Sequence, residues 1–286
     1  MKTKKVSLGI FAALIVAGSI MVSCKEDAVS LPPIGGFNNA DEVAASNLVA
    51  YWGLNGDGKE AKSGAMPSKS QNVTFASGGP KGQAANFTSG YLSYDAITAL
   101  NSLPNATISM WVNVKNNGTN PASFFTLTRP NEWAGNINLM AETGWRKATS
   151  DTLVIKGLVV TKVAGNDSWQ DSRNEPTKGG VQAALFGGKW THIVMTWDGA
   201  TSMFKIYANG VKISNPEWEA RGTTGPLNFT TPTKAIIGAW GTNVSGGTAE
   251  AWQVPMTGMV DEIRVFNKAL SDGDINSLYQ LEMAGR

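Results

Sequence analysis

The chain contains few side chains that could act as nucleophiles or bind a transition metal. Its 286 residues include one histidine, His192, and one cysteine, Cys24. A structural zinc site needs four such ligands, and a catalytic triad needs a histidine beside a serine and a carboxylate. Because the chain has no second histidine and no candidate cysteine, we expect His192 to be structural. It should share a strand face with Val194 and Thr196.

Carboxylates are the second group with potential chemistry. Hydrolysis of a glycosidic bond uses two of them, about 5–5.5 Å apart in retaining enzymes. On one strand they would occupy positions i and i+2. Residues 217–219 (Glu-Trp-Glu) come closest to that spacing, but Pro216 beside them favours a solvated loop. Asp167 and Asp171 fall in a stretch rich in Gly and Asn, which also predicts solvated side chains. The sequence gives no positive sign of an enzyme.

Asp261 is a carboxylate in an apolar strand pattern. It alternates with Ile263 and Val265, and that parity predicts an inward-pointing side chain. A buried carboxylate must be paired, hydrogen-bonded or bound to a cation, because burying an uncompensated charge is costly. We therefore expect Asp261 to have a defined partner.

Tryptophan is the most informative residue type. The chain has ten, and six lie in loop-like, polar surroundings: Trp133, Trp145, Trp169, Trp218, Trp240 and Trp252. An exposed indole offers a large apolar face and one hydrogen-bond donor, a combination enriched in recognition sites. Such a ring can stack on the apolar face of a sugar. Some of the six should only pin loops to the domain, and we predict that at least one contacts a ligand.

The elements that would position these residues are short strands separated by Gly, Asn, Ser and Pro turns. Residues 107–114 alternate clearly, with Ile108, Met110, Val112 and Val114 on one face. Further strands are predicted at 191–197, 204–208 and 259–266. Asn209-Gly210 predicts a hairpin turn, because both positions of such a turn need positive φ. Ser271 is expected to cap a short C-terminal helix that runs toward Leu281.

The first residues are typical of an export signal. Lys2, Lys4 and Lys5 precede an apolar run that is too short to span a membrane, which predicts a signal peptide over residues 1–23. The run ends at Cys24 in a pattern that resembles a bacterial lipobox, so we expect Cys24 to be acylated. Residues 25–27 (Lys-Glu-Asp) resemble the export signals of Bacteroidetes-type surface lipoproteins. The expected location is the cell surface, lipid-anchored in the outer membrane.

Residues 24–46 contain several Pro, Gly and Asn and few apolar side chains, which predicts a flexible tether. Removal of residues 1–23 would lower Lys+Arg from 24 to 21 against 22 Asp+Glu. The mature chain would then be nearly neutral. No cluster of basic residues indicates nucleic-acid binding.

Seven segments resemble, in order, the laminin-G-like jelly roll of the concanavalin A-like lectin/glucanase type. They are residues 48–52 (LVAYW), 82–87 (GQAANF), 107–112 (TISMWV), 188–194 (GKWTHIV), 206–210 (IYANG), 236–238 (IIG) and 258–271 (GMVDEIRVFNKALS). The resemblance covers residues 47–283, with an insertion-rich part at 129–187. It implies an all-β, antiparallel two-sheet jelly-roll sandwich with a short C-terminal helix. The absence of crossover helices independently favours antiparallel sheets.

The resemblance also implies a structural calcium ion near Asp261. The Asp-Ser pair that the family uses as an N-terminal ligand appears here as Lys62-Ser63, and Asp57 or Asn55 would have to replace it. Oxygen ligands of this kind suit calcium. A plain hydrogen-bonded aspartate is the alternative.

The leading functional hypothesis is a non-catalytic glycan-binding surface protein that holds polysaccharide. Its ligand-binding residues would be Trp133, Trp145, Trp169 and Trp240. A protein-binding adhesin is the first alternative. A glycoside hydrolase or polysaccharide lyase is the second, although the Glu-x-Asp-x-x-Glu signature of the hydrolases of this fold is missing.

Overall fold

The computed structural model describes residues 31–175 and 186–286. The described residues from 33 to 286 form one compact unit. The predicted signal peptide and Cys24 lie outside the described residues. Within the described part of the chain, no helix is both long and apolar enough to cross a membrane.

The described chain is built mainly from thirteen strands that pair antiparallel. In chain order they are β1 (Leu48–Trp52), β2 (Lys69–Gly79), β3 (Gly82–Ser93), β4 (Ala106–Asn113), β5 (Ala122–Leu127), β6 (Ile137–Ala141), β7 (Ile155–Val163), β8 (Asn166–Arg173), β9 (Thr191–Asp198), β10 (Met203–Ala208), β11 (Val211–Lys212), β12 (Ala235–Ile237) and β13 (Met256–Phe266). Two helices, α1 (Gly241–Val244) and α2 (Asp272–Met283), complete the description together with short 3-10 turns.

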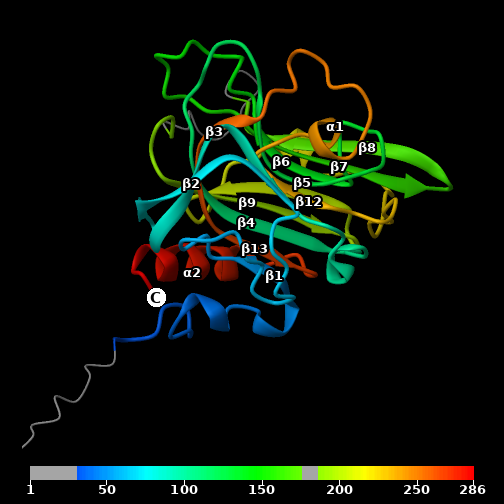
Figure 1. The fold of residues 1–286 in the computed structure, drawn as a ribbon. Helices are drawn as coiled ribbons and strands as arrows, with labels where there is room; N and C mark the ends of the chain where they lie inside the picture. Colours follow the sequence, from blue (N-terminus) through cyan, green and yellow to red (C-terminus); the bar gives the residue numbers. More distant parts are fainter. Residues whose placement is uncertain (1–30, 176–185) are drawn as a thin grey trace, which may run out of the picture. The chain divides into compact units, whose positions relative to one another are not determined.

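The strands form one curled sheet with two layers (Figure 1). The first layer has the order β11-β10-β9-β4-β13, with β1 beside the end of β13. The second layer has the order β12-β5-β6-β7-β8. Strand β3 joins them, because its first part pairs with β13 and its last residues pair with β12. This arrangement confirms the predicted all-β, antiparallel, two-layered class.

The core lies between the layers. Gly157 of β7 is so close to β10 that an added Cβ would lie 2.7 Å from the Phe204 ring and 2.9 Å from Ile206. The predicted face of β4, including Ile108 and Met110, is fully buried in this core. The Asn209-Gly210 hairpin is also confirmed, since both residues have positive φ and join β10 to β11.

The outer face of the first layer is covered by α2 (Figure 1). The Ser271 hydroxyl accepts a hydrogen bond from the Asp274 amide at 3.1 Å, which confirms the predicted cap. Leu278 of α2 packs with Val194 of β9 in a cluster that also contains Ala40 and Val43. Because Ala40 and Val43 are buried, the prediction of a flexible tether is wrong for residues 33–46. Their few apolar side chains are enough to dock this segment on the domain.

Candidate functional site

Four tryptophans form a contiguous group, which we call the indole cluster: Trp133, Trp169, Trp240 and Trp252. Trp133 is at its centre. Its ring centroid lies 5.1 Å from that of Trp252, 5.7 Å from that of Trp240 and 5.8 Å from that of Trp169. Trp240 and Trp252 also meet at 5.2 Å. The mostly tilted and edge-to-face geometries are those that aromatic quadrupoles favour.

The indole cluster lies on the outer face of the second layer. Trp169 of β8 pairs with Val160 of β7, and directly opposed residues of paired strands share a face. Val160 and Leu158 are buried in a small apolar patch with Ala134, against which Trp133 packs. Strand β8 therefore positions Trp169, and the patch beneath supports Trp133.

Two loops bring Trp133 and Trp240 together. The Gly241 amide donates a hydrogen bond to the Trp133 carbonyl at 3.1 Å. A Cβ on residue 241 would overlap the Glu132 carbonyl oxygen, so this close approach requires glycine. The Trp240 amide donates to Asn243 Oδ1 at 3.0 Å, which holds the loop at the start of α1.

The four rings differ in exposure. Trp169 is 46% exposed, whereas Trp133 and Trp252 are half-buried. Trp240 is 0% exposed, so the predicted ligand-stacking role is wrong for this residue. The Trp133 and Trp252 rings, which come from other loops, pack against the Trp240 ring. Trp252, which sequence reasoning left out of its four site residues, contributes a partly accessible ring instead. Its Nε1 donates to Glu250 Oε2 at 2.7 Å.

Charged residues lie beside the exposed Trp169 ring. The Arg129 guanidinium lies 5.5 Å from the Trp169 ring centroid and binds Asp167 at 3.0 Å. The Lys162 ammonium also binds Asp167. The hydrogen bond from Lys162, together with the charge of Arg129, holds the pKa of Asp167 below its usual value. Asp167 is therefore an ionised acceptor. It lies on β8 and not in a loop, whereas its side chain is exposed to solvent as predicted. No sequence pattern marked Arg129.

Trp145 is not part of the indole cluster. It is 50% exposed and lies near Arg173, whose guanidinium carbon is 5.7 Å from the Trp145 ring centroid and 3.8 Å from that of Trp218. Arg173 also binds Asp171 at 3.0 Å, so Asp171 lies on β8 and not in the predicted solvated loop. Trp169 and Arg173 are four residues apart on β8 and share its outer face. The second layer thus carries two aromatic groups along one strand.

Backbone amides bond both predicted calcium donors, Asp57 and Asp261. Asp57 Oδ1 accepts from the Lys59 amide at 3.0 Å, in the turn before β2. The two oxygens of Asp261 accept from the Lys81 and Glu262 amides at 3.3 and 3.0 Å. Among the described residues, no group of three His, Cys, Asp or Glu side chains could hold a metal ion. Calcium can also take backbone carbonyl and Asn oxygens as ligands, so its binding near Asp261 stays a prediction.

The Asp261 side chain lies on the outer face of the first layer, and not on the core face that alternation predicts. It pairs with Trp111, which contacts α2, whereas Val260 and Ile263 are in the core. A bulge between Asp261 and Arg264, with Glu262 at φ 48°, inserts the extra residue. The bulge reverses the parity that alternation predicts. Burial, reinforced by the Glu262 carboxylate, raises the pKa of Asp261 to about 8.

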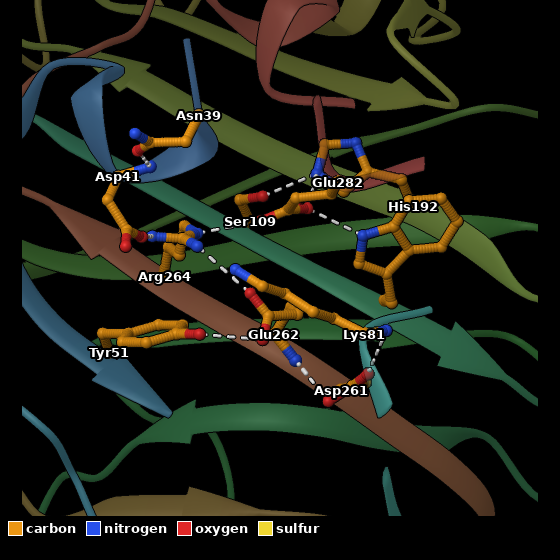
Figure 2. Close-up of polar contacts among 11 residues, drawn as sticks. Asn39, Asp41, Tyr51, Lys81, Ser109, His192, Asp261, Glu262, Arg264 and Glu282 are labelled. Atoms are coloured by element: carbon orange, nitrogen blue, oxygen red, sulfur yellow. Dashed lines mark hydrogen bonds and ion pairs between the residues drawn. The ribbon is translucent and has the colours of Figure 1, made fainter. Parts of the chain in front are cut away.

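A buried polar network joins this strand to α2 and to the N-terminal segment (Figure 2). Arg264 donates to Glu282 at 2.8 Å, to Glu262 at 3.1 Å and to Asp41 at 2.7 Å. The Tyr51 hydroxyl donates to Glu262 at 2.8 Å. Arg264, Glu262 and Glu282 are all completely buried, so the network serves the packing of these elements and not a surface site.

His192 belongs to the same region (Figure 2). Its Nε2 lies 2.7 Å from Ser109 Oγ and 3.7 Å from Glu282 Oε2. A catalytic triad needs the serine and the acid on different ring nitrogens. Here both face Nε2, and all three side chains are completely buried. Burial also lowers the pKa of His192 to about 3, so the ring is neutral and its role is structural.

A known protein family matches most of the described domain. Residues 86–276 match the family model described as the concanavalin A-like lectin/glucanases superfamily. No curated protein matches the chain significantly.

Solved structures with a similar fold share little sequence with this chain. Domain 4 of AbnA, an extracellular arabinanase of Geobacillus stearothermophilus solved with arabinotriose, is 19% identical with a TM-score of 0.53; the alignment covers 82% of this chain and 98% of that one. The ligand binding domain of botulinum neurotoxin serotype D, solved with N-acetylneuraminic acid, is 13% identical with a TM-score of 0.54. That alignment covers 83% of this chain and 52% of the neurotoxin chain. At these identities the likeness concerns the fold.

Proposed function

The chain belongs to the concanavalin A-like lectin/glucanases superfamily, and from that premise we propose that its indole cluster binds carbohydrate without a catalytic step. The observation that carries the proposal is the arrangement around Trp169. This ring is 46% exposed on a supported aromatic group, beside an ion pair between Arg129 and Asp167. Fold alone does not fix function in this superfamily, so the site has to carry the argument.

The chemistry of the site suits a sugar. The Trp169 face can cover the C–H side of a pyranose or furanose ring, and Trp133 and Trp252 extend the apolar surface around it. Asp167 is held ionised by Lys162 and Arg129, so it can accept hydrogen bonds from hydroxyl groups. Buried Trp240 packs against the Trp133 and Trp252 rings and holds them in place, which lowers the ordering cost of binding.

The acids at this face are poorly suited to glycoside hydrolysis. A general acid needs a raised pKa so that it still carries its proton near neutral pH. The pKa of Asp167 is lowered instead. Asp171 is bound to Arg173 at 3.0 Å and lies 3.8 Å from the Lys156 ammonium. This supports a binding module over a hydrolase or lyase.

Two structures of similar fold support the class of ligand. Domain 4 of AbnA was solved with arabinotriose, and the serotype D neurotoxin domain with N-acetylneuraminic acid. A protein-binding adhesin would present one broad apolar patch. Of the large exposed apolar residues, Met66 lies in the loop before β2, Val211 on β11 and Met283 at the end of α2. We further propose that acylated Cys24 holds the domain at the cell surface, where polysaccharide would be available.

A glycan array followed by calorimetry tests the proposal. The wild-type domain should bind one or more polysaccharides, and Trp169→Ala should lower that affinity at least about tenfold, by analogy with other aromatic hot spots. Trp169→Phe should retain most of the affinity because it keeps a stacking face. Val211→Ala, an exposed residue at the edge of the first layer, serves as the matched control. Unchanged affinity in Trp169→Ala would rule out this site.

A further inference from the structure

A separate pocket of about 460 Å³ lies at the rim where the first layer meets the start of β5. It is lined by the end of β4, by the loop over residues 114–121, by residues 254–259 at the start of β13, and by Ser89 of β3. This volume falls within the range of small-ligand pockets, which is roughly 300–1,000 Å³. None of the four rings of the indole cluster lines it.

The floor of the pocket is apolar. Val114, Ala122 and Met256 line it and are each at least nine-tenths buried. Val254 also lines it and is 36% exposed, which places an accessible apolar side chain at the pocket. One face of a compact ligand could be covered by these groups.

The polar lining is rich in amides without partners. Asn116 is 3% exposed, and its Nδ2 donates to the Ser150 and Thr152 carbonyls at 2.8 Å each, but its Oδ1 has no hydrogen-bond partner. Asn113 and Asn120 also line the pocket, and their side-chain amides make no hydrogen bond within the described residues. Asn117 differs, because its Oδ1 accepts from the Thr119 and Asn120 amides and shapes the loop. Buried polar groups are normally satisfied, so the unused Oδ1 of Asn116 points to an external partner, whereas half-buried Asn113 and Asn120 offer accessible amides at the pocket.

The only charged side chain among the described lining residues of the pocket is positive. Lys115 lines it, is exposed, and forms no ion pair with any described residue. The described lining residues include no Asp or Glu. A cation that is not neutralised attracts an anionic group, and a planar carboxylate is a common partner of such a group.

We propose that this pocket binds one sugar residue that carries a carboxylate, such as a hexuronic acid. Lys115 binds the carboxylate, Asn113 and Asn120 exchange hydrogen bonds with hydroxyl groups, and Val254 with Met256 covers the apolar side of the ring. The proposal does not depend on carbohydrate binding at the indole cluster. The two sites are linked only by the short segment 252–254, since Trp252 belongs to the indole cluster and Val254 lines the pocket.

The test compares D-glucuronic acid with D-glucose in NMR titrations of the folded domain. The two sugars differ only at C6, which is a carboxylate in the acid and a CH₂OH group in glucose. Glucuronic acid should bind at least about tenfold more tightly, and the preference should weaken with added salt. Lys115→Gln should remove the preference, and Asn113→Ala with Asn120→Ala should weaken both sugars. Lys59→Gln, an exposed lysine outside the pocket, is the matched control and should change nothing.

Three outcomes overturn the proposal: neither sugar perturbs residues 113–122 and 254–259, the two sugars bind equally, or Lys115→Gln keeps the preference. Trp169→Ala separates the two sites. It should lower polysaccharide affinity at the indole cluster at least about tenfold and leave glucuronic acid binding unchanged. If Trp169→Ala abolishes glucuronic acid binding, the pocket is not the site. If neither the wild type nor any variant binds polysaccharide, while glucuronic acid still binds in a way that depends on Lys115, only the proposed function of the indole cluster is wrong.

Discussion

Trp133 and Trp252 meet edge to face, with 5.1 Å between their ring centroids and an interplanar angle of 81°. Trp133 precedes β6 and Trp252 precedes β13, so the contact joins loops that are far apart in the chain. An aromatic pair of this kind contributes about 0.5–1.5 kcal/mol beyond its buried area. The surface around Trp169 therefore depends on contacts between the rings of the indole cluster.

The first prediction distinguishes a tryptophan that stabilises the indole cluster from one that mainly contacts the ligand. Trp133→Ala should lower both the free energy of unfolding, by about 3 kcal/mol, and the affinity for polysaccharide, because Trp133 touches all three other rings. Trp169→Ala should lower affinity with less than about 1 kcal/mol of lost stability, since its ring is 46% exposed. Urea denaturation and calorimetry on both variants give the comparison. Equal stability losses would contradict it.

The second prediction concerns a residue with no side chain. Gly241→Ala should weaken polysaccharide binding although every tryptophan is retained, because the new Cβ would overlap the Glu132 carbonyl and separate the two loops. Overpacking of this kind costs about 1–3 kcal/mol of stability. Gly273→Ala in α2 is the matched control, as its nearest neighbour would be 3.8 Å from the new Cβ. Calorimetry and thermal unfolding of both variants measure the effect.

The third prediction is a pH dependence of stability. Burial raises the pKa of Asp261 from 3.8 to about 8, so the folded protein holds a proton that the unfolded chain has released over this range. The free energy of unfolding should then be highest below about pH 4 for this group and fall as the pH rises through 8. Urea midpoints measured from about pH 5 to about pH 8 should decrease.

Asp261→Asn should flatten that decrease. Burial raises the pKa of Glu282 in the same direction, so the variant reduces the slope without removing it. The Glu262 carboxylate and the Lys81 amide face Asp261 and remain in place. An unchanged slope in Asp261→Asn would show that this carboxyl does not carry the effect.

The fourth prediction concerns ligand length. Four residues separate Trp169 from Arg173 on β8, which corresponds to about 13 Å, more than one sugar ring can span. Trp145→Ala should therefore weaken binding of long oligosaccharides and leave short ones unaffected. Trp169→Ala should weaken both. Affinities measured over a series of oligosaccharide lengths test this. Equal effects of Trp145→Ala on all lengths would contradict the idea that one long oligosaccharide contacts both Trp169 and Trp145.

Local signals predicted local structure well. Asn209-Gly210 identified its hairpin and Ser271 its helix, because each depends on backbone preferences of a few residues. Alternation also placed Ile108 in the core. The same rule failed at Asp261, because one inserted residue in β13 reverses parity and leaves no mark in the pattern of residue types.

The candidate site was harder to predict because it depends on distant contacts. The count and setting of tryptophans pointed to Trp133 and Trp169. The sequence could not show that Trp240 is covered by another loop, or that Trp145 lies apart beside Arg173. Arg129 had no distinguishing feature until β8 brought Asp167 to it.

The two ends of the domain hold each other in place. The Ala40 amide donates to the Arg286 carbonyl at 3.3 Å, and Arg286 Nε donates to the Asn38 carbonyl at 2.9 Å. Fraying of one end must therefore loosen the other. An affinity tag fused directly after Arg286 would pull on the segment around Ala40, and a short glycine spacer would avoid that strain.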